Sequence, residues 1–241
     1  MGLERLFDST GLDLPAEALY TRVVFPEAPP DRPYVFVNMV ATADGKIVIG
    51  EVGGSASGVG GPTDQLLFRR LQQVCDGALI GSGTLRASPV IYPVEKPRFV
   101  VTRSGQVPLE NRFFTDAPDR AFVLAPEDLP QEMATRLAGR LLCFGRGEVD
   151  LCAALRHLRQ ERGIRYLLCE GGADLNDRLL RAGLVDELFL TLAPKLKGGA
   201  HLPTVVDGQG FPPGQFVPLS LVSLYRDGDE VYFRYRVRGG V

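Results

Sequence analysis

Residues 166–183 of the sequence read YLLCEGGADLNDRLLRAG. The first four are apolar and predict a buried β-strand, and residues 174–182 predict a helix that Gly183 ends. The two elements meet at Glu170-Gly171-Gly172, where glycines let a ligand approach the backbone and the start of a helix favours an anion. The simpler interpretation is an ordinary strand-to-helix turn with Asp174 as a first-turn acid. In both interpretations a strand runs directly into a helix, which is typical of an α/β sheet.

The same alternation of strands and helices continues on both sides of this stretch. Apolar runs predict strands at residues 34–40, 78–80, 98–102, 121–125, 141–144 and 187–192. Helical spacing of apolar residues predicts helices at 64–74 and 150–162. Residues 219–224 and 231–237 predict a hairpin around Arg226-Asp227-Gly228-Asp229. This order predicts an α/β domain with a mixed, mostly parallel sheet, whose ligands bind beyond the carboxyl ends of the strands.

Length and composition exclude several classes of protein. The 241 residues predict one large or two small domains, and we divide them into a leader segment, 1–33, that wraps a domain formed by 34–241. A net charge of −2 argues against a nucleic-acid-binding protein. No apolar run approaches the roughly 20 residues that cross a membrane. The N-terminus lacks the basic-then-apolar order of a signal peptide, which predicts a cytoplasmic protein.

The cysteines and histidines argue against a metal site. The chain has two histidines and no C-x-x-C pair, so it offers no tightly spaced zinc ligands. The cysteines lie in or beside apolar stretches, which predicts buried thiols in a reducing compartment. They are Cys75, Cys143, Cys152 and Cys169.

Three further segments place glycines or polar residues beside a predicted strand. Gly81-Ser82-Gly83 is either a tight turn or a loop that approaches a ligand. Residues 38–46 cluster polar groups around an Asp-Gly turn, before a small-residue loop at 53–58 that could cover a substrate. Thr102-Arg103-Ser104 ends a strand without an acidic residue. It is either a solvated turn or a site for a phosphate monoester, such as the 2′-phosphate of NADPH.

Other catalytic patterns are missing from the sequence. It contains no G-x-x-x-x-G-K-[ST] loop, no G-x-S-x-G elbow and no plausible Ser–His–acid set. A chain with so few candidate acids and bases points to a cofactor that carries the reaction itself.

Taken in order, these segments resemble the riboflavin-biosynthesis pyrimidine reductases, which form the C-terminal half of the bifunctional bacterial deaminase/reductase. The resemblance runs from about residue 33 to residue 237. It is carried by Thr42-Ala43-Asp44-Gly45-Lys46, by residues 77–84 and by the block from Cys169 through Ala193-Pro194-Lys195. It implies a three-layer dihydrofolate-reductase-like fold with helices on both faces of the sheet, a homodimer, and NADPH as cofactor. The implied reaction reduces the ribosyl side chain of a 5-phosphoribosylamino-pyrimidine to ribityl by hydride transfer to C1′.

The resemblance also implies roles for individual residues. The implied catalytic residues are Lys46 and Glu170. The implied NADPH contacts are Val40, Thr42, Asp44, Gly81, Gly83, Thr84, Thr102, Arg103, Ser104, Gly171, Gly172, Ala173 and Leu175. The implied substrate contacts are Asn38, Lys46, Ser55, Arg86 and Glu170.

The chain departs from the family pattern on the substrate side. The family carries an acidic pair where this chain has Ala87 and Ser88, and an arginine late in the preceding helix where it has Gln72. Candidates for the missing phosphate contact are Arg69, Arg70 and Arg86. Two alternatives therefore stay open: a reductase of the same fold acting on another C=N or C=C compound, such as a pterin, and a nucleotide-binding protein without turnover.

Overall fold

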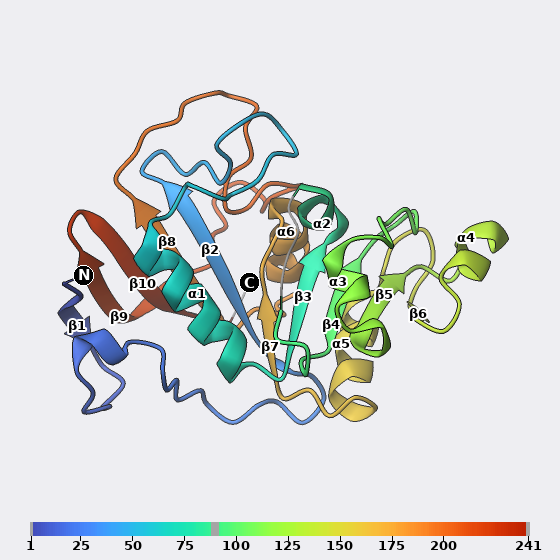
Figure 1. The fold of residues 1–241 in the computed structure, drawn as a ribbon, viewed down its shortest axis with the longest axis horizontal. Coiled ribbons are helices and arrows are strands. Elements are labelled where there is room, and N and C mark those ends of the chain that lie inside the picture. Colours follow the sequence, from blue (N-terminus) through green and yellow to red (C-terminus); the bar gives the residue numbers. More distant parts are fainter. Residues whose placement is uncertain (1, 88–91, 240–241) are drawn as a thin grey trace.

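The computed structural model describes residues 2–87 and 92–239, which form one ten-stranded sheet flanked by helices (Figure 1). The order across the sheet is β1-β9-β10-β8-β2-β7-β3-β4-β5-β6. The strands are β1 Glu4–Asp8, β2 Tyr34–Thr42, β3 Gly77–Gly81, β4 Arg98–Val101, β5 Ala121–Ala125, β6 Leu141–Cys143, β7 Tyr166–Cys169, β8 Glu187–Ala193, β9 Leu219–Asp227 and β10 Glu230–Val237. The helices are α1 Pro62–Val74, α2 Ser82–Ala87, α3 Arg112–Thr115, α4 Gln131–Arg136, α5 Leu151–Gln160 and α6 Ala173–Arg181, with 3₁₀ turns at Ala16–Ala18 and Pro118–Arg120.

The sheet has a parallel body and an antiparallel edge. All strands from β8 to β6 in the sheet order pair in parallel, with β2 between β7 and β8. The remaining strands are antiparallel: β10 pairs with β8 and β9, and β9 pairs with β1. In the centre, Val37 of β2 lies opposite Cys169 of β7 and Leu188 of β8. The predicted mixed, mostly parallel sheet with a C-terminal hairpin is confirmed.

Helices cover both faces of the sheet, as the three-layer fold requires (Figure 1). Phe36 of β2 packs on one face with Leu67 and Leu71 of α1. Its neighbour Val37 packs on the opposite face, in the cluster that includes residues of α5 and α6. Successive side chains of a strand point to opposite faces, so one strand serves both layers. A third cluster joins β3 and β4 to α2 and α3 on the α1 side.

Part of residues 1–33 belongs to the sheet. Strand β1 pairs with β9, with Glu4 opposite Arg226, and the ring of Phe25 lies 4.7 Å from that of Phe36. Strand β1 was not among the expected elements. Four of its five residues are exposed, so its sequence carries no alternation of buried and exposed positions that would indicate a strand.

The glycines at residues 81–83 are not a tight turn. Strand β3 ends at Gly81 and helix α2 begins at Ser82, so Gly83 lies in the first turn of a short helix. The start of this helix is hard to predict from the sequence, because two of the three residues are glycines and glycine is a poor helix former.

Two of the four cysteine predictions are wrong. Cys75 and Cys169 are buried, but Cys143 and Cys152 are exposed. Cys143 ends the edge strand β6, and Cys152 lies on the solvent side of α5. Within residues 2–87 and 92–239, no three His, Cys, Asp or Glu side chains lie close enough to share a metal ion. No helix in the same ranges is long and apolar enough to span a membrane.

Candidate functional site

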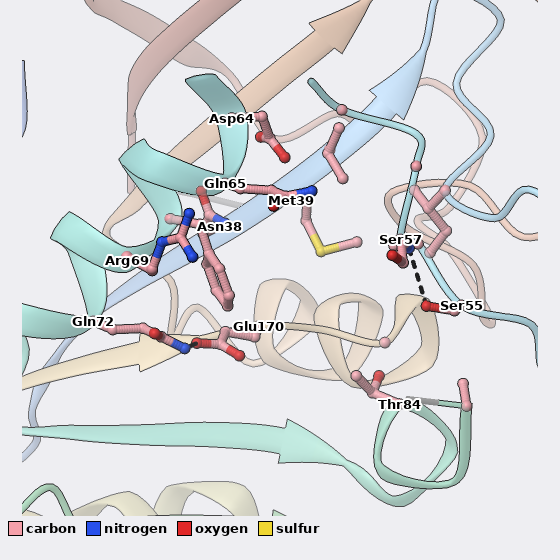
Figure 2. Close-up of a pocket in the computed structure, with 18 of the residues that line it drawn as sticks. Asn38, Met39, Ser55, Ser57, Asp64, Gln65, Arg69, Gln72, Thr84 and Glu170 are labelled. Carbon is pink, nitrogen blue, oxygen red and sulfur yellow. Dashed lines mark hydrogen bonds between the residues drawn. The ribbon is translucent and has the colours of Figure 1, made fainter. Parts of the chain in front are cut away.

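A cavity of about 840 Å³ lies where β2, β3 and β7 approach their carboxyl ends. Helix α1 forms one wall, because Asp64, Phe68 and Gln72 recur every four residues and therefore share one helix face. The loop between β2 and α1 forms another wall, to which Ser55 and Ser57 belong (Figure 2). The remaining lining residues that bear on the chemistry are Asn38, Met39 and Val40 of β2, Thr84 of α2, Arg69 of α1, and Tyr92, Glu170 and Gly172.

Two glycine segments that are far apart in the sequence meet beside the cavity. The backbone N–H of Gly81 donates to the carbonyl of Gly171 over 2.8 Å, and the Gly171–Gly172 peptide bond is cis. Gly171 has a φ of +74°, and a Cβ there would lie 2.9 Å from the sulfur of Met39. A Cβ on Gly172 would lie 3.2 Å from Oγ1 of Thr84. A side chain at Gly171 is therefore strained and crowded, so the end of β7 can come close to β3 and to a ligand.

Glu170 directly follows β7 and is held by two hydrogen bonds. The hydroxyl of Tyr92 donates to its Oε2 over 2.6 Å, and Nε2 of Gln72 donates to its Oε1 over 3.1 Å. Burial raises the pKa of Glu170 to about 7, while these two hydrogen bonds oppose the shift. Both protonation states are therefore accessible near neutral pH, which suits a residue that delivers or accepts a proton.

Asp64 is a second carboxyl group in the cavity, and Figure 2 shows it on the side opposite Glu170. Burial raises the pKa of Asp64 to about 6; a hydrogen bond from Thr191 opposes this shift and the charge of Glu230 adds to it. Its position on the cavity face of α1 was not predicted from the sequence. The signal that could have found it is the four-residue spacing of Asp64, Phe68 and Gln72 in the predicted helix.

Arg69 is the cationic residue that lines the cavity within the described part of the chain. Arg70 points elsewhere, since it donates to the carbonyls of Glu17 and Leu19 over 2.9 and 2.6 Å. Arg86 is exposed and is not among the lining residues. Of the three arginines considered as phosphate contacts, the structure places Arg69 at the cavity. Ala87 also lines it, whereas Ser88 lies outside the described residues.

The polar residues after β2 contact other parts of the protein. Asp44 accepts hydrogen bonds from Thr42 and from the backbone N–H groups of Lys197 and Gly198, over 2.7, 2.9 and 2.7 Å. These bonds lower the pKa of Asp44 to about 2. Lys46 donates from Nζ to the carbonyl of Leu202 over 3.2 Å. None of the three side chains lines the cavity, although the following Ile47 and Val48 do.

The other predicted site residues fall into three groups. Asn38, Val40, Ser55, Thr84, Glu170 and Gly172 line the cavity. Gly81, Gly83, Gly171, Ala173 and Leu175 lie next to it, on the elements that begin or end there. Thr102, Arg103 and Ser104 follow β4, the neighbour of β3, and form a separate turn in which Thr102 accepts from the N–H of Gly105 over 3.2 Å. That turn is at the same edge of the sheet, outside the cavity lining.

The fold and the site define an α/β protein with a mixed, mostly parallel sheet and a ligand cavity at the carboxyl ends of its parallel strands. Residues 33–233 match the family model described as the RibD C-terminal domain. This match covers most of the chain, and the chain belongs to that family.

Three similar proteins illustrate the family. The 2,5-diamino-6-ribosylamino-4(3H)-pyrimidinone 5′-phosphate reductase of Methanothermobacter thermautotrophicus is 30% identical over an alignment of 219 residues, which covers 86% of this chain and 100% of that one. A pyrimidine reductase-like protein of Corynebacterium diphtheriae has a structure that matches with a TM-score of 0.73 at 19% identity, covering 87% of this chain and 94% of that one. The Thermotoga maritima diaminohydroxyphosphoribosylaminopyrimidine deaminase/5-amino-6-(5-phosphoribosylamino)uracil reductase matches with a TM-score of 0.60 at 20% identity. The match covers 86% of this chain and 57% of the bifunctional protein.

Proposed function

We propose that the protein is an NADPH-dependent reductase of riboflavin biosynthesis. It reduces the ribosyl side chain of a 6-ribosylamino-pyrimidine 5′-phosphate to ribityl: a hydride adds to C1′ of the open imine form, and a proton adds to the imine nitrogen. The observation that carries the proposal is the similarity along 86% of the chain to the Methanothermobacter protein named as a 2,5-diamino-6-ribosylamino-4(3H)-pyrimidinone 5′-phosphate reductase. The cavity supports it, because it combines a carboxyl group that titrates near neutrality with a cationic side chain.

The meeting point of β3, β7 and α6 fits a nicotinamide dinucleotide. Gly81, Gly171 and Gly172 leave backbone without side chains beside Thr84. The first-turn N–H groups of α6, at Ala173 and Leu175, have no acceptors within the helix and suit a pyrophosphate. Arg103 and Ser104, one strand further along, suit the 2′-phosphate of NADPH. NADPH would supply the hydride when bound. These residues would hold and orient it, together with Gly83, Thr102, the β2 residues Val40 and Thr42, and Asp44 of the turn after β2.

Glu170 and Lys46 are the proposed catalytic residues. Glu170 delivers the proton to the imine nitrogen, since its pKa of about 7 leaves a protonated fraction at neutral pH. Lys46 lies beside the loop wall. Its assignment as a catalytic residue is based on the resemblance to the family. Asn38 of β2 and Ser55 of the loop wall contact the substrate. Arg69 binds the phosphate, a role for which Arg86 was also a candidate from the sequence. Enclosure between α1 and the loop limits access of water to the imine.

The first test is a thermal melt with NADPH and, in parallel, NADH. Saturation at about 100 times the dissociation constant stabilises a protein by roughly 2.7 kcal/mol, which gives a clear rise in melting temperature. We expect this rise with NADPH and a much smaller one with NADH, followed by NADPH consumption when the pyrimidine phosphate is added. Stabilisation without turnover of any pyrimidine would favour a different substrate, such as a pterin. Absence of stabilisation by both nucleotides would exclude the reductase.

We also propose that the protein is a homodimer. Half-exposed apolar side chains alternate along one face of β8 and β10: Leu188, Leu190, Leu192, Val231, Phe233 and Tyr235. The strand register places Phe233 opposite Leu190 and Tyr235 opposite Leu188, so they form one continuous patch. A patch of this kind marks an interface.

Light scattering should therefore give twice the chain mass of 26.2 kDa. Phe233→Glu places a charge in the patch and should return the mass to that of one chain, because a buried unpaired charge opposes association. Val94→Glu, which changes an exposed apolar residue elsewhere, is the matched control. A wild-type mass of one chain would overturn the dimer.

The expected partner is a small molecule, and the expected location is the cytoplasm. The net charge of −2 supports a partner other than a nucleic acid. The four cysteines are all free, which supports a reducing compartment.

A further inference from the structure

The two carboxyl groups of the cavity are not equivalent. Both oxygens of Glu170 already accept a hydrogen bond, one from Tyr92 and one from Gln72. Asp64 interacts with Thr191 of β8, which lowers its pKa and partly offsets the effect of burial. A carboxylate has about four lone-pair positions, so Asp64 keeps acceptor capacity on the cavity side. Asp64 is therefore the carboxylate that can accept hydrogen bonds from a ligand without breaking an existing pair.

The surroundings of Asp64 hold its carboxylate at the cavity. A Cβ on Gly60 would lie 2.3 Å from Oδ2 of Asp64, so the absence of a side chain at Gly60 makes the room that the carboxylate occupies. A simpler role for Asp64 would be that of an acid that caps the first turn of α1. A capping carboxylate accepts backbone N–H bonds, which lower its pKa. The pKa of Asp64 is raised instead, and its bonding partner is a side chain of another element.

Phe68 lies one helical turn after Asp64 and lines the same cavity. An aromatic side chain offers a flat apolar surface to a heteroaromatic ring. Asn38, on β2, adds an amide that can donate to a ring carbonyl. Arg69 follows Phe68 on α1 and can meet an anion attached to that ring. Carboxylate, aromatic face, amide and cation thus lie around one cavity, as a phosphorylated aminopyrimidine requires.

The chemistry of Asp64 distinguishes two candidate ring systems. A 2-amino-4(3H)-pyrimidinone presents two adjacent donors, the ring N3–H and the 2-amino group, which match the two oxygens of one carboxylate. The corresponding uracil presents N3–H between two carbonyl oxygens. Beside a carboxylate, the 2-carbonyl of that uracil would leave one acceptor facing another, which costs binding free energy.

We propose that Asp64 reads position 2 of the pyrimidine ring and selects the 2-amino-4-pyrimidinone over its 2-oxo counterpart. This inference rests on the proposed reductase function.

The test is a comparison of kcat/KM for the 2-amino and the 2-oxo ribosylamino-pyrimidine 5′-phosphates with wild-type enzyme and with Asp64→Asn. A hydrogen bond to a charged group is worth about 1.5–3 kcal/mol, so the wild type should prefer the 2-amino compound by roughly 10- to 150-fold. An asparagine side chain offers one donor and one acceptor, which match the C2 carbonyl and N3–H of the uracil. Asp64→Asn should therefore lower the preference at least tenfold, mainly through KM.

Asp119→Asn, at an exposed acid of the short turn before β5, is the matched control and should keep the wild-type preference. Equal kcat/KM values for the two compounds in the wild type, or preference for the uracil, would overturn the role of Asp64 even if Asp64→Asn did not fold. An unchanged preference in a folded Asp64→Asn would do the same. A wild type that stabilises with NADPH but turns over neither compound would instead remove the proposed function.

Discussion

Glu170→Gln should lower kcat by roughly two to four orders of magnitude, the usual contribution of a positioned general acid. The glutamine keeps the size of the side chain and can still pair with Tyr92 and Gln72, but it has no proton to deliver. Single-turnover consumption of NADPH with saturating substrate would measure the loss at the chemical step. Glu132→Gln, at an exposed glutamate of α4, is the control and should leave kcat unchanged.

The pH profile separates proton delivery from a structural role of Glu170. Burial raises the pKa of Glu170 to about 7, and its neighbours are Tyr92, Gln72 and the thiols of Cys75 and Cys169, whose own pKa values burial raises to about 12. A general acid must be protonated, so wild-type kcat/KM should fall tenfold per pH unit above about 7. Tyr92→Phe removes a donor that stabilises the carboxylate, which raises the pKa and moves this limb to higher pH. Wild-type kcat in Glu170→Gln would exclude Glu170 from the chemistry.

Arg69→Ala should raise KM for the phosphorylated substrate by roughly 10- to 150-fold and leave kcat nearly unchanged. The expected loss corresponds to a charge-assisted hydrogen bond of about 1.5–3 kcal/mol. Arg69 lies on the cavity face of α1, whereas Arg70, the next residue, is occupied by two carbonyls of the N-terminal segment. A guanidinium group matches the geometry of a phosphate, so lysine would restore part of the affinity.

The dephosphorylated substrate provides the internal comparison. With it, wild type and Arg69→Ala should have the same KM, because the group that Arg69 binds is missing. Arg156→Ala, at an exposed arginine of α5 on the other face of the sheet, is the matched control. An equal rise in KM for both substrates would show that Arg69 supports the shape of the cavity and does not contact the phosphate.

Local sequence was sufficient to predict strands β2 to β10 and helices α1, α5 and α6, but not the short helices α3 and α4. Strand β5 begins and ends where the apolar run predicts, and β7 does so as well. Strand β1 was missed because its partner β9 lies more than 200 residues away and its own residues are mostly exposed. Helix α2 was missed because glycines at its start suggest a turn. Pairing at long range therefore decided β1, and α2 forms although its glycines are poor helix formers.

The sequence was sufficient to predict the site residues that follow the end of a strand, but not those whose position depends on which face of a helix points to the cavity. Glu170 follows β7 directly, and the carboxyl ends of parallel strands meet at one edge, so its place at the cavity could be expected. Asp64 reaches the cavity through the rotation of α1, which depends on packing against the sheet, and Tyr92 lies in no element that the sequence predicts. Lys46 was expected at the substrate, and the structure shows its ammonium group on the carbonyl of Leu202.

The central position of β2 in the sheet determines how long this strand stays unpaired during synthesis of the chain. Strand β2 is complete at Thr42, but its neighbours β7 and β8 begin at Tyr166 and Glu187. Strands β3 to β6 emerge in the order in which they pair, whereas β2 has no neighbour to pair with until most of the chain has been made. The nascent protein therefore carries a nine-residue strand with both faces apolar and both edges open through most of its synthesis. That strand is where a chaperone, or a neighbouring nascent chain, would meet it first.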